Sequence, residues 1–142
     1  MFENLMATAV LPASDLDRAK GWWHDVLGRD PIYADAEFGN LFYEIGGVVV
    51  LVYRTDFGGT AQNTAFNLVT ENLDRDTTEL RTRGVVFHDY DLPGLKTVDG
   101  IAQLGDLRSA WFSDSEGNII AIGEPTAEMM EMAKKIRAGA AS

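Results

Sequence analysis

Hydrophobic and polar positions along the chain alternate in two ways, one typical of strands and one typical of helices. Short apolar runs bounded by glycine and polar residues, such as Val48–Tyr53 (VVVLVY), predict strands. The segment Leu16–Leu27 is different, because its apolar residues recur at helical spacing and predict an amphipathic helix. Ser14 is the expected N-cap of this helix and Gly28 its stop. Trp23 lies in the middle of the apolar stripe and is expected to anchor the core.

The second half of the chain has weaker signals. Leu73–Arg83 predicts a second helix with a thin apolar face, and Val85–Tyr90 (VVFHDY) predicts the strand that follows. Asp91–Gly100 contains proline and two glycines and is predicted to be a loop. Residues 125–142 predict a helix with a small-residue tail. The methionines of this helix form an apolar patch, which we expect to pack on the domain or on a dimer partner.

An internal repeat organises these elements. LPASDLDR, which begins at Leu11, recurs as LVTENLDR from Leu68, and in both copies an apolar stretch precedes it and a predicted helix follows. Each half then continues with an aromatic strand, a glycine-containing turn and an aliphatic strand. Repetition at this scale indicates one unit used twice. We therefore predict an α+β domain of two βαβββ modules, residues 1–56 and 64–124, joined by a linker at 57–63.

Composition narrows the possible partners. The net charge of −10, from 22 acidic and 12 basic residues, argues against nucleic acid binding and is compatible with a cationic ligand. With no cysteine, disulfides and thiolate metal sites are excluded. No apolar run approaches the roughly 20 residues that span a bilayer. The N-terminal MFENLMATAV lacks the features of a secretory signal, so we expect a cytoplasmic protein without membrane contact.

Two stretches together resemble the vicinal oxygen chelate superfamily, which includes glyoxalase I, extradiol dioxygenases and the fosfomycin- and bleomycin-resistance proteins. LPASDLDRAKGWWHDVLG, from Leu11, is similar to the opening strand, turn and helix of the family. AWFSDSEGNIIAIGE, from Ala110, is similar to its closing hairpin. The resemblance covers about residues 7–124. It implies that the curved sheets of the two βαβββ modules, with largely antiparallel strands, form a half-open barrel around a cavity.

In metal-dependent members of that superfamily, four side chains, usually His, Gln or Glu, hold one divalent ion. Carried over by spacing, the resemblance places these positions at Thr8, Ala65, Val50 or Leu51, and Ala121. One hydroxyl and three hydrocarbon side chains cannot hold such an ion, which needs imidazole or carboxylate donors. We therefore expect neither a metal site nor another cofactor.

The only two histidines, His24 and His88, form no pair at metal-ligand spacing. His24 is expected to be exposed on the first helix. His88 could act as a general base, but the neighbouring Asp89 should point to the opposite face of the strand and is poorly placed to orient it. A surface or strand-end position is the alternative for His88.

Without charged ligands at its centre, the barrel should hold an apolar pocket with aromatic walls and a few polar groups. Asn67 shares strand parity with Ala65 and should face the same side. The alternative is a cavity filled by side chains. The predicted pocket residues are Thr8, Tyr33, Phe38, Phe42, Leu51, Tyr53, Ala65, Asn67, Trp111 and Ala121.

The resemblance to bleomycin-resistance proteins implies non-catalytic binding of a small organic molecule, aromatic or cationic, by a homodimer with grooves between its subunits. A glyoxalase-type lyase or isomerase, or a dioxygenase, with an unconventional site is the second hypothesis. It would need unusual metal ligands, or acid–base work by His88 or a carboxylate. A structural dimer with an occluded cavity is the third.

Overall fold

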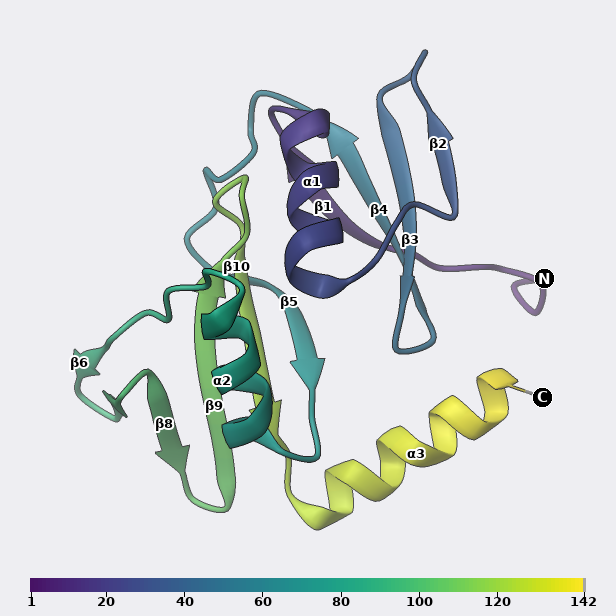
Figure 1. Ribbon diagram of the computed structural model, residues 1–142. Coiled ribbons are helices and arrows are strands. Elements are labelled where there is room, and N and C mark those ends of the chain that lie inside the picture. Colours follow the sequence, from purple (N-terminus) through teal and green to yellow (C-terminus); the bar gives the residue numbers. More distant parts are fainter. Residues whose placement is uncertain (142) are drawn as a thin grey trace.

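The computed structural model describes residues 1–141 and contains two mixed β-sheets and three helices (Figure 1). Strands of the first sheet, in spatial order, are β1 (Ala9–Ala13), β4 (Val48–Arg54), β3 (Asn40–Ile45) and β2 (Tyr33–Asp35). Those of the second sheet are β5 (Thr64–Val69), β10 (Ile119–Glu124), β9 (Leu107–Ser113), β8 (Ile101–Leu104), β7 (Leu95–Val98) and β6 (Asp91–Leu92). In each sheet the first two strands in this order are parallel and all other pairs are antiparallel. The predicted α+β fold with mixed, largely antiparallel sheets is confirmed.

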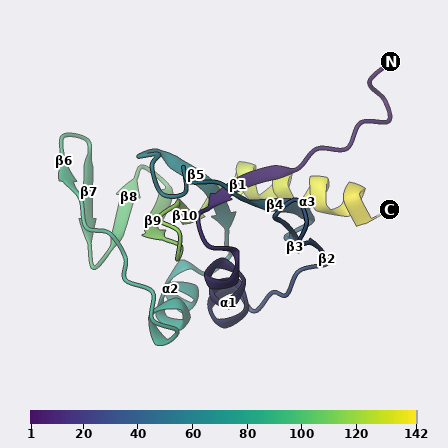
Figure 2. The same ribbon diagram turned by 90° about the horizontal axis from the view of Figure 1, so that it is seen from above.

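The helices α1 (Leu16–Leu27) and α2 (Leu73–Thr82) lie together on one side of the two sheets (Figure 2). As expected, Gly28 terminates α1 as its C-cap, with a φ of +64° that belongs to the left-handed region that glycine adopts without strain. Its N-cap, however, is Asp15 and not Ser14, because the Asp15 side chain accepts a hydrogen bond from the Arg18 N–H at 3.0 Å. The hydroxyl of Ser14 instead donates a hydrogen bond to Glu116 Oε1, in the turn between β9 and β10.

Two predictions about the second module were wrong. The segment predicted as a loop forms the β6–β7 hairpin, whose two-residue turn is Pro93–Gly94. Proline followed by glycine at φ +78° suits a type II turn, so these residues make a tight reversal where a longer loop was expected. The segment Val85–Tyr90, predicted as a strand, contributes a single bridge from Phe87 to Phe112. After this bridge the chain leaves the edge of β9 and forms the β6–β7 hairpin. The next strand, β8, then pairs with the segment of β9 from Leu107 to Ala110.

Two hydrophobic clusters fill the space between the helices and the sheets. In the first, Trp23 is 1% exposed and its ring stacks on Tyr43 at 4.3 Å between centroids, so the expected core role of Trp23 is confirmed. The second cluster surrounds Phe112. Trp22 packs against both clusters and lies 6.3 Å from the Phe112 ring, which joins the two modules on the helix side.

The third helix, α3 (Ala127–Ala141), leaves the end of β10 and runs beneath the turn between β3 and β4 (Figure 1). Its exposed apolar residues Met129, Met132 and Ile136 recur at helical spacing and form a stripe. Among the residues that the structure describes, no helix is long and apolar enough to cross a membrane.

Candidate functional site

The face of each sheet that points away from α1 and α2 is called the open face. In the first sheet, backbone pairing aligns four open-face residues in one row across the strands, and their chain neighbours Leu11, Leu41, Val50 and Val52 are buried in the core. Because successive side chains of a strand point to opposite faces, the side chains of this row point away from the core and from α1 and α2. The rings of Tyr33 and Phe42 lie 5.8 Å apart within it. The row is Val10, Leu51, Phe42 and Tyr33.

The second sheet carries a similar row. Ala121 pairs with Asn67 on one side and with Trp111 on the other, and the neighbouring Ile120 and Phe112 are fully buried on the helix side. Trp111 is half-buried and Ala121 is 5% exposed. This row thus offers an indole ring, a small apolar floor and a polar amide.

The four positions that the sequence resemblance implied as metal ligands fall on or beside these rows. Leu51 and Ala121 belong to them, Ala65 lies at a shift in the register between β5 and β10 and has no partner on β10, and Thr8 directly precedes β1. Of the two residues considered for β4, Val50 is buried against α1, so Leu51 is the open-face residue. These side chains do not fit a divalent ion. Among the described residues no group of three or more His, Asp or Glu side chains could hold a metal.

The other predicted pocket residues are dispersed. Tyr53 lies two residues beyond Leu51 on the open face of the first sheet, where it pairs with Asn40 and Pro12. Phe38 lies in the turn between β2 and β3 and is 73% exposed, outside the row. Apart from Phe38 and Thr8, the predicted residues thus lie in two groups, one on each sheet.

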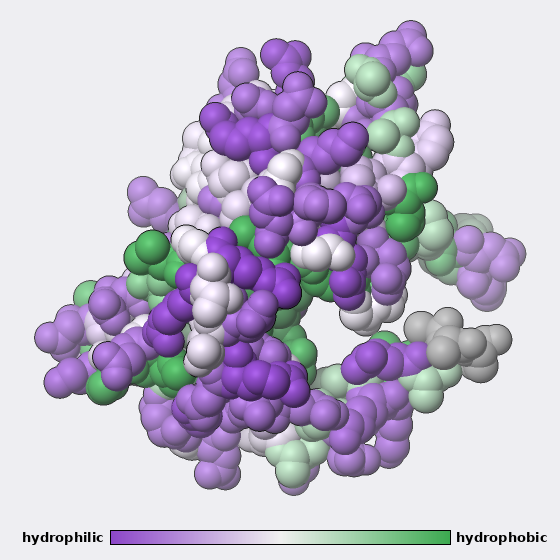
Figure 3. Space-filling model, in the orientation of Figure 1, coloured by the Kyte–Doolittle hydropathy of each residue, from purple (hydrophilic) through white to green (hydrophobic). Residues whose placement is uncertain are grey.

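Asn67 also lines a pocket of about 270 Å³ between the β3–β4 turn, β5 and α3. The space-filling view shows the molecule hollowed between the first module and α3 (Figure 3). The walls of the pocket are mainly apolar and include Phe66 and Met130, with Lys134 among its polar groups. Lys134 Nζ lies 3.4 Å from Glu71 Oε1, so the two side chains form an ion pair. Sequence reasoning missed this pocket because it depends on where α3 settles; the apolar patch predicted for that helix was the available signal.

A polar cluster adjoins Trp111 on the open face of the second sheet. The backbone N–H of His88 donates to the Trp111 carbonyl at 2.8 Å, which holds the histidine beside the indole. His88 Nδ1 lies 3.0 Å from Tyr90 Oη, and His88 Nε2 lies 3.0 Å from Ser113 Oγ. The Tyr90 ring stands nearly perpendicular to that of Trp111 at 5.7 Å. The partners of His88 could be found only once the pairing of the strands was known.

Two predictions about the histidines, that Asp89 does not orient His88 and that His24 is exposed, agree with the structure. Asp89 does not bond His88 but accepts a hydrogen bond from the Thr97 hydroxyl at 3.2 Å. His24 is exposed on α1, where a hydrogen bond with Asp30 at 2.8 Å raises its pKa.

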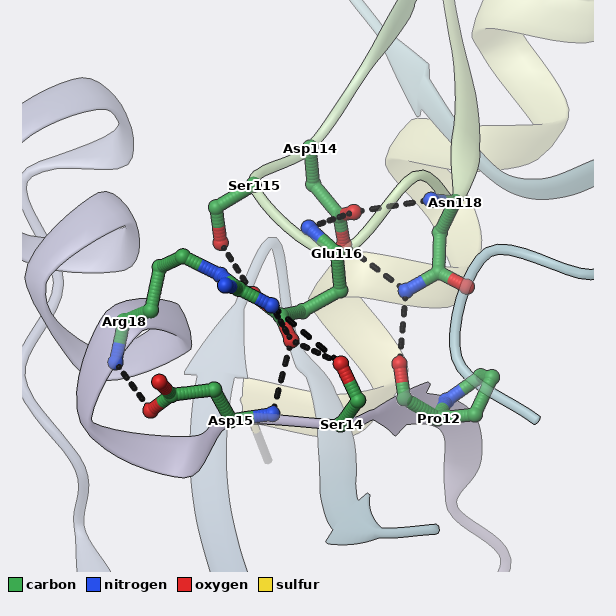
Figure 4. A network of polar contacts seen from close by, with 8 residues as sticks. All are labelled: Pro12, Ser14, Asp15, Arg18, Asp114, Ser115, Glu116 and Asn118. Carbon is green, nitrogen blue, oxygen red and sulfur yellow. Dashed lines mark hydrogen bonds and ion pairs between the residues drawn. The ribbon is translucent and has the colours of Figure 1, made fainter. Parts of the chain in front are cut away.

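A buried carboxylate anchors the β9–β10 turn to the start of α1 (Figure 4). Glu116, whose side chain is 1% exposed, accepts hydrogen bonds from Arg18 Nε at 2.7 Å and from the Asp15 N–H at 2.9 Å. Burial alone would raise the pKa of Glu116, but the hydrogen bonds from Arg18, Asp15 and Ser115 outweigh it and lower the pKa to about 2.

The same turn holds a second carboxylate with the opposite shift. Asp114 Oδ1 accepts from the N–H groups of Glu116 and Asn118 at 2.9 and 2.8 Å, and yet burial raises its pKa above the usual range. The Asn118 amide donates to the Pro12 carbonyl at 2.8 Å. These bonds fix the start of β10, and with it the position of Ala121 beside Trp111.

No family model matches the sequence, and no curated protein matches it. Among solved structures, UcmS2 is 17% identical with a TM-score of 0.66, over 85% of this chain and 99% of that chain. A mutant of the fosfomycin resistance protein FosX from Listeria monocytogenes, complexed with Mn(II) and 1S,2S-dihydroxypropylphosphonic acid, is 19% identical with a TM-score of 0.61, over 88% and 93%. TnmS3, an antibiotic binding protein from Streptomyces sp. CB03234, is 22% identical with a TM-score of 0.55, over 87% and 98%. The chain therefore has the fold of the vicinal oxygen chelate superfamily.

Proposed function

We propose, from this fold and its open faces, that the chain is a non-catalytic protein that binds an aromatic or cationic organic molecule without a metal. One observation carries the proposal. At the four positions where the resemblance implies metal ligands the chain has Thr8, Leu51, Ala65 and Ala121, and aromatic rings lie in register beside Leu51 and Ala121 on the open faces.

The chemistry of the open faces suits a flat ligand. Trp111 on the second sheet and Phe42 with Tyr33 on the first are planar apolar surfaces next to small or aliphatic side chains. Aromatic rings stack on such surfaces and gain more than the buried area alone provides. The net charge of −10 would in addition raise the local concentration of a cationic molecule.

Similar structures support binding as the function. TnmS3 is an antibiotic binding protein, whereas the FosX structure was obtained with Mn(II). This chain lacks the donor set that such an ion requires, so the binding protein is the closer functional parallel. A metal-dependent glyoxalase-type lyase, isomerase or dioxygenase would need ligands that these positions do not supply.

A homodimer in the cytoplasm is part of the proposal. The stripe of Met129, Met132 and Ile136 on α3 is 46%, 57% and 64% exposed, respectively, which leaves an apolar helix face for a second copy. Each open face would then be covered by the partner and the ligand held in the groove between them. The two groups of pocket residues, which lie on separate sheets of one chain, agree with this arrangement.

A thermal-shift screen with planar aromatic and cationic compounds tests the proposal. A ligand at a hundred times its dissociation constant should stabilise the protein by about 2.7 kcal/mol. We expect Trp111→Ala to lose the shift. Phe57→Ala, which removes a 73% exposed ring in the segment between the modules, should keep it. The absence of a shift across the whole screen would reject the proposal.

A further inference from the structure

The hydroxyl groups of Tyr90 and Ser113 are held by the two nitrogens of one imidazole. His88 is half-buried, and both of its contacts measure 3.0 Å. Within the described chain neither Tyr90 Oη nor Ser113 Oγ has another hydrogen-bond partner. Both hydroxyls lie on the open face beside Trp111, next to the row that continues to Ala121 and Asn67.

The protons of this cluster can be counted. A neutral imidazole has one N–H donor and one acceptor nitrogen, so one hydroxyl donates to the ring and the other accepts from it. The hydroxyl that accepts keeps its own O–H free. If Nε2 carries the proton, the free donor is Ser113, and if Nδ1 carries it, the free donor is Tyr90. A protonated ring donates to both oxygens and frees both O–H groups. The cluster thus always keeps at least one O–H group that is not donated to the imidazole.

Nearby carboxylates do not consume this donor. Asp89 accepts from the Thr97 hydroxyl at 3.2 Å, and Asp114 is occupied by the N–H groups of its own turn. In the described chain no hydrogen bond joins either acid to the hydroxyl of Tyr90 or of Ser113. Hydroxyl donors are therefore available beside Trp111, although the chain as a whole has a net charge of −10.

We infer that His88, Tyr90 and Ser113 form a donor array that binds an acceptor oxygen of the ligand, such as a carboxylate, phenolate or carbonyl, while its ring system packs on Trp111. The inference rests on the proposed binding function and specifies its ligand class as a planar aromatic molecule with an acceptor oxygen on its edge. The array would favour such a molecule over an aromatic cation at this position, because an ammonium group has donors and no acceptor.

Three probes with one ring system test the inference at pH 8: 2-naphthoate, 2-naphthylmethylammonium and 2-methylnaphthalene. Their dissociation constants can be measured by NMR titration against the full chain. We expect 2-naphthoate to bind at least fivefold more tightly than 2-methylnaphthalene. Ser113→Ala should reduce this preference only partly, since the ring and Tyr90 still supply a donor. The matched control Thr78→Ala removes an exposed hydroxyl on α2, outside the open face, and should change nothing.

The triple variant His88→Phe/Tyr90→Phe/Ser113→Ala removes every donor of the array. It should bind 2-naphthoate no better than 2-methylnaphthalene while still binding the latter. If the triple variant fails to fold, Tyr90→Phe/Ser113→Ala serves in its place and should lower the preference at least threefold. Tightest binding of the ammonium probe, or a preference for 2-naphthoate that survives loss of all donors, would overturn the inference and leave the proposed function standing. Binding of none of the three probes would instead count against the proposed aromatic ligand itself.

Discussion

The guanidinium Nε of Arg18 lies 2.7 Å from Oε2 of Glu116 and joins the first helix to the last β-turn of the domain. The Arg18 side chain is 52% exposed, whereas that of Glu116 is 1% exposed, so the carboxylate is the buried partner. Glu116 also accepts the Asp15 N–H, a backbone donor at the N-terminus of α1. One side chain from the second module thus completes the start of a helix in the first.

Replacing Glu116 with Gln should destabilise the fold at neutral pH and barely at pH 2. The folded-state pKa of about 2 lies below the ordinary value of 4.5, so the stabilisation is present above pH 4.5 and is lost as the pH falls toward 2. Because Arg18 is half-exposed, we expect a loss of about 2 kcal/mol at pH 7. Urea unfolding of both proteins between pH 2 and pH 7 measures the difference. A difference independent of pH would contradict the assignment.

The comparison must be made between the two proteins because Asp114 has the opposite dependence. Its folded-state pKa is raised, so its contribution is largest below its unfolded pKa and falls as the pH rises through the folded value. Burial, the largest cause of the raised pKa of Asp114, is common to both proteins, so subtraction removes that part; only the smaller part that comes from the charge of Glu116 is lost in the variant.

Tyr43→Phe should raise stability or leave it unchanged. The Tyr43 ring is fully buried against Trp23, and its hydroxyl has no hydrogen-bond partner among the described residues. Burial raises the pKa of this phenol to about 12. Removing a buried unsatisfied hydroxyl recovers its desolvation cost, about 1 kcal/mol. Thermal unfolding checks this, and a loss above about 1 kcal/mol would indicate a partner for the hydroxyl.

Trp23→Ala should mainly reduce stability, whereas Trp111→Ala should mainly reduce ligand binding. Trp23 is 1% exposed in the core, so its truncation should cost about 3–5 kcal/mol. Trp111 is half-buried on the open face, and its loss should cost less stability but abolish binding of aromatic ligands. Chemical denaturation together with ligand titration separates the two effects. Equal stability losses would show that Trp111 is a core residue.

The purified protein should bind no Mn²⁺, Fe²⁺ or Zn²⁺ stoichiometrically. Leu51, Ala65 and Ala121 have no donor atoms, and Thr8 supplies one hydroxyl. Elemental analysis after incubation with each metal and desalting is the measurement. A stoichiometric ion, lost on mutation of an open-face residue, would reverse the functional proposal.

Substituting Met132 on α3 with Glu should weaken self-association by at least tenfold. The residue is 57% exposed and lies in the middle of the apolar stripe, where a buried charge would be unfavourable. Gly21→Glu is the matched control, since it adds the same charge on an exposed part of α1 with open space around it. Analytical ultracentrifugation over a range of concentrations gives the dissociation constants. A wild-type protein that stays monomeric would reject the dimer.

The fold could be predicted because its signals are local and repeated. The helical spacing around Trp23 and the recurrence of LPASDLDR as LVTENLDR are visible in the sequence alone. Strand alternation places Asn67 on the open face through its pairing with Ala121, whereas the register shift at Ala65 could not be read from the sequence. The choice of Asp15 over Ser14 as N-cap could not be predicted, because both are good caps and a carboxylate 101 positions away from Asp15 decides between them.

The missing parts of the site depend on contacts between distant segments. A Pro-Gly pair such as Pro93–Gly94 is equally typical of a loop and of a tight turn. Only the pairing of the flanking residues Leu92 and Leu95 identifies the hairpin. Ser113 lies 25 positions from His88, so nothing in the sequence connects them. The pocket under α3 exists only because that helix turns back toward the first module.

The bond between Arg18 and Glu116 spans 98 positions of a 142-residue chain. During synthesis, the start of the first helix therefore lacks its acceptor until most of the polypeptide has left the ribosome. Contacts so distant in sequence slow the search for the native topology, since the intervening chain must be ordered before they form. The N-terminal part of α1 therefore completes its hydrogen bonds late in synthesis. In a product truncated before the β9–β10 turn, the Arg18 side chain and the Asp15 N–H would lack their acceptor.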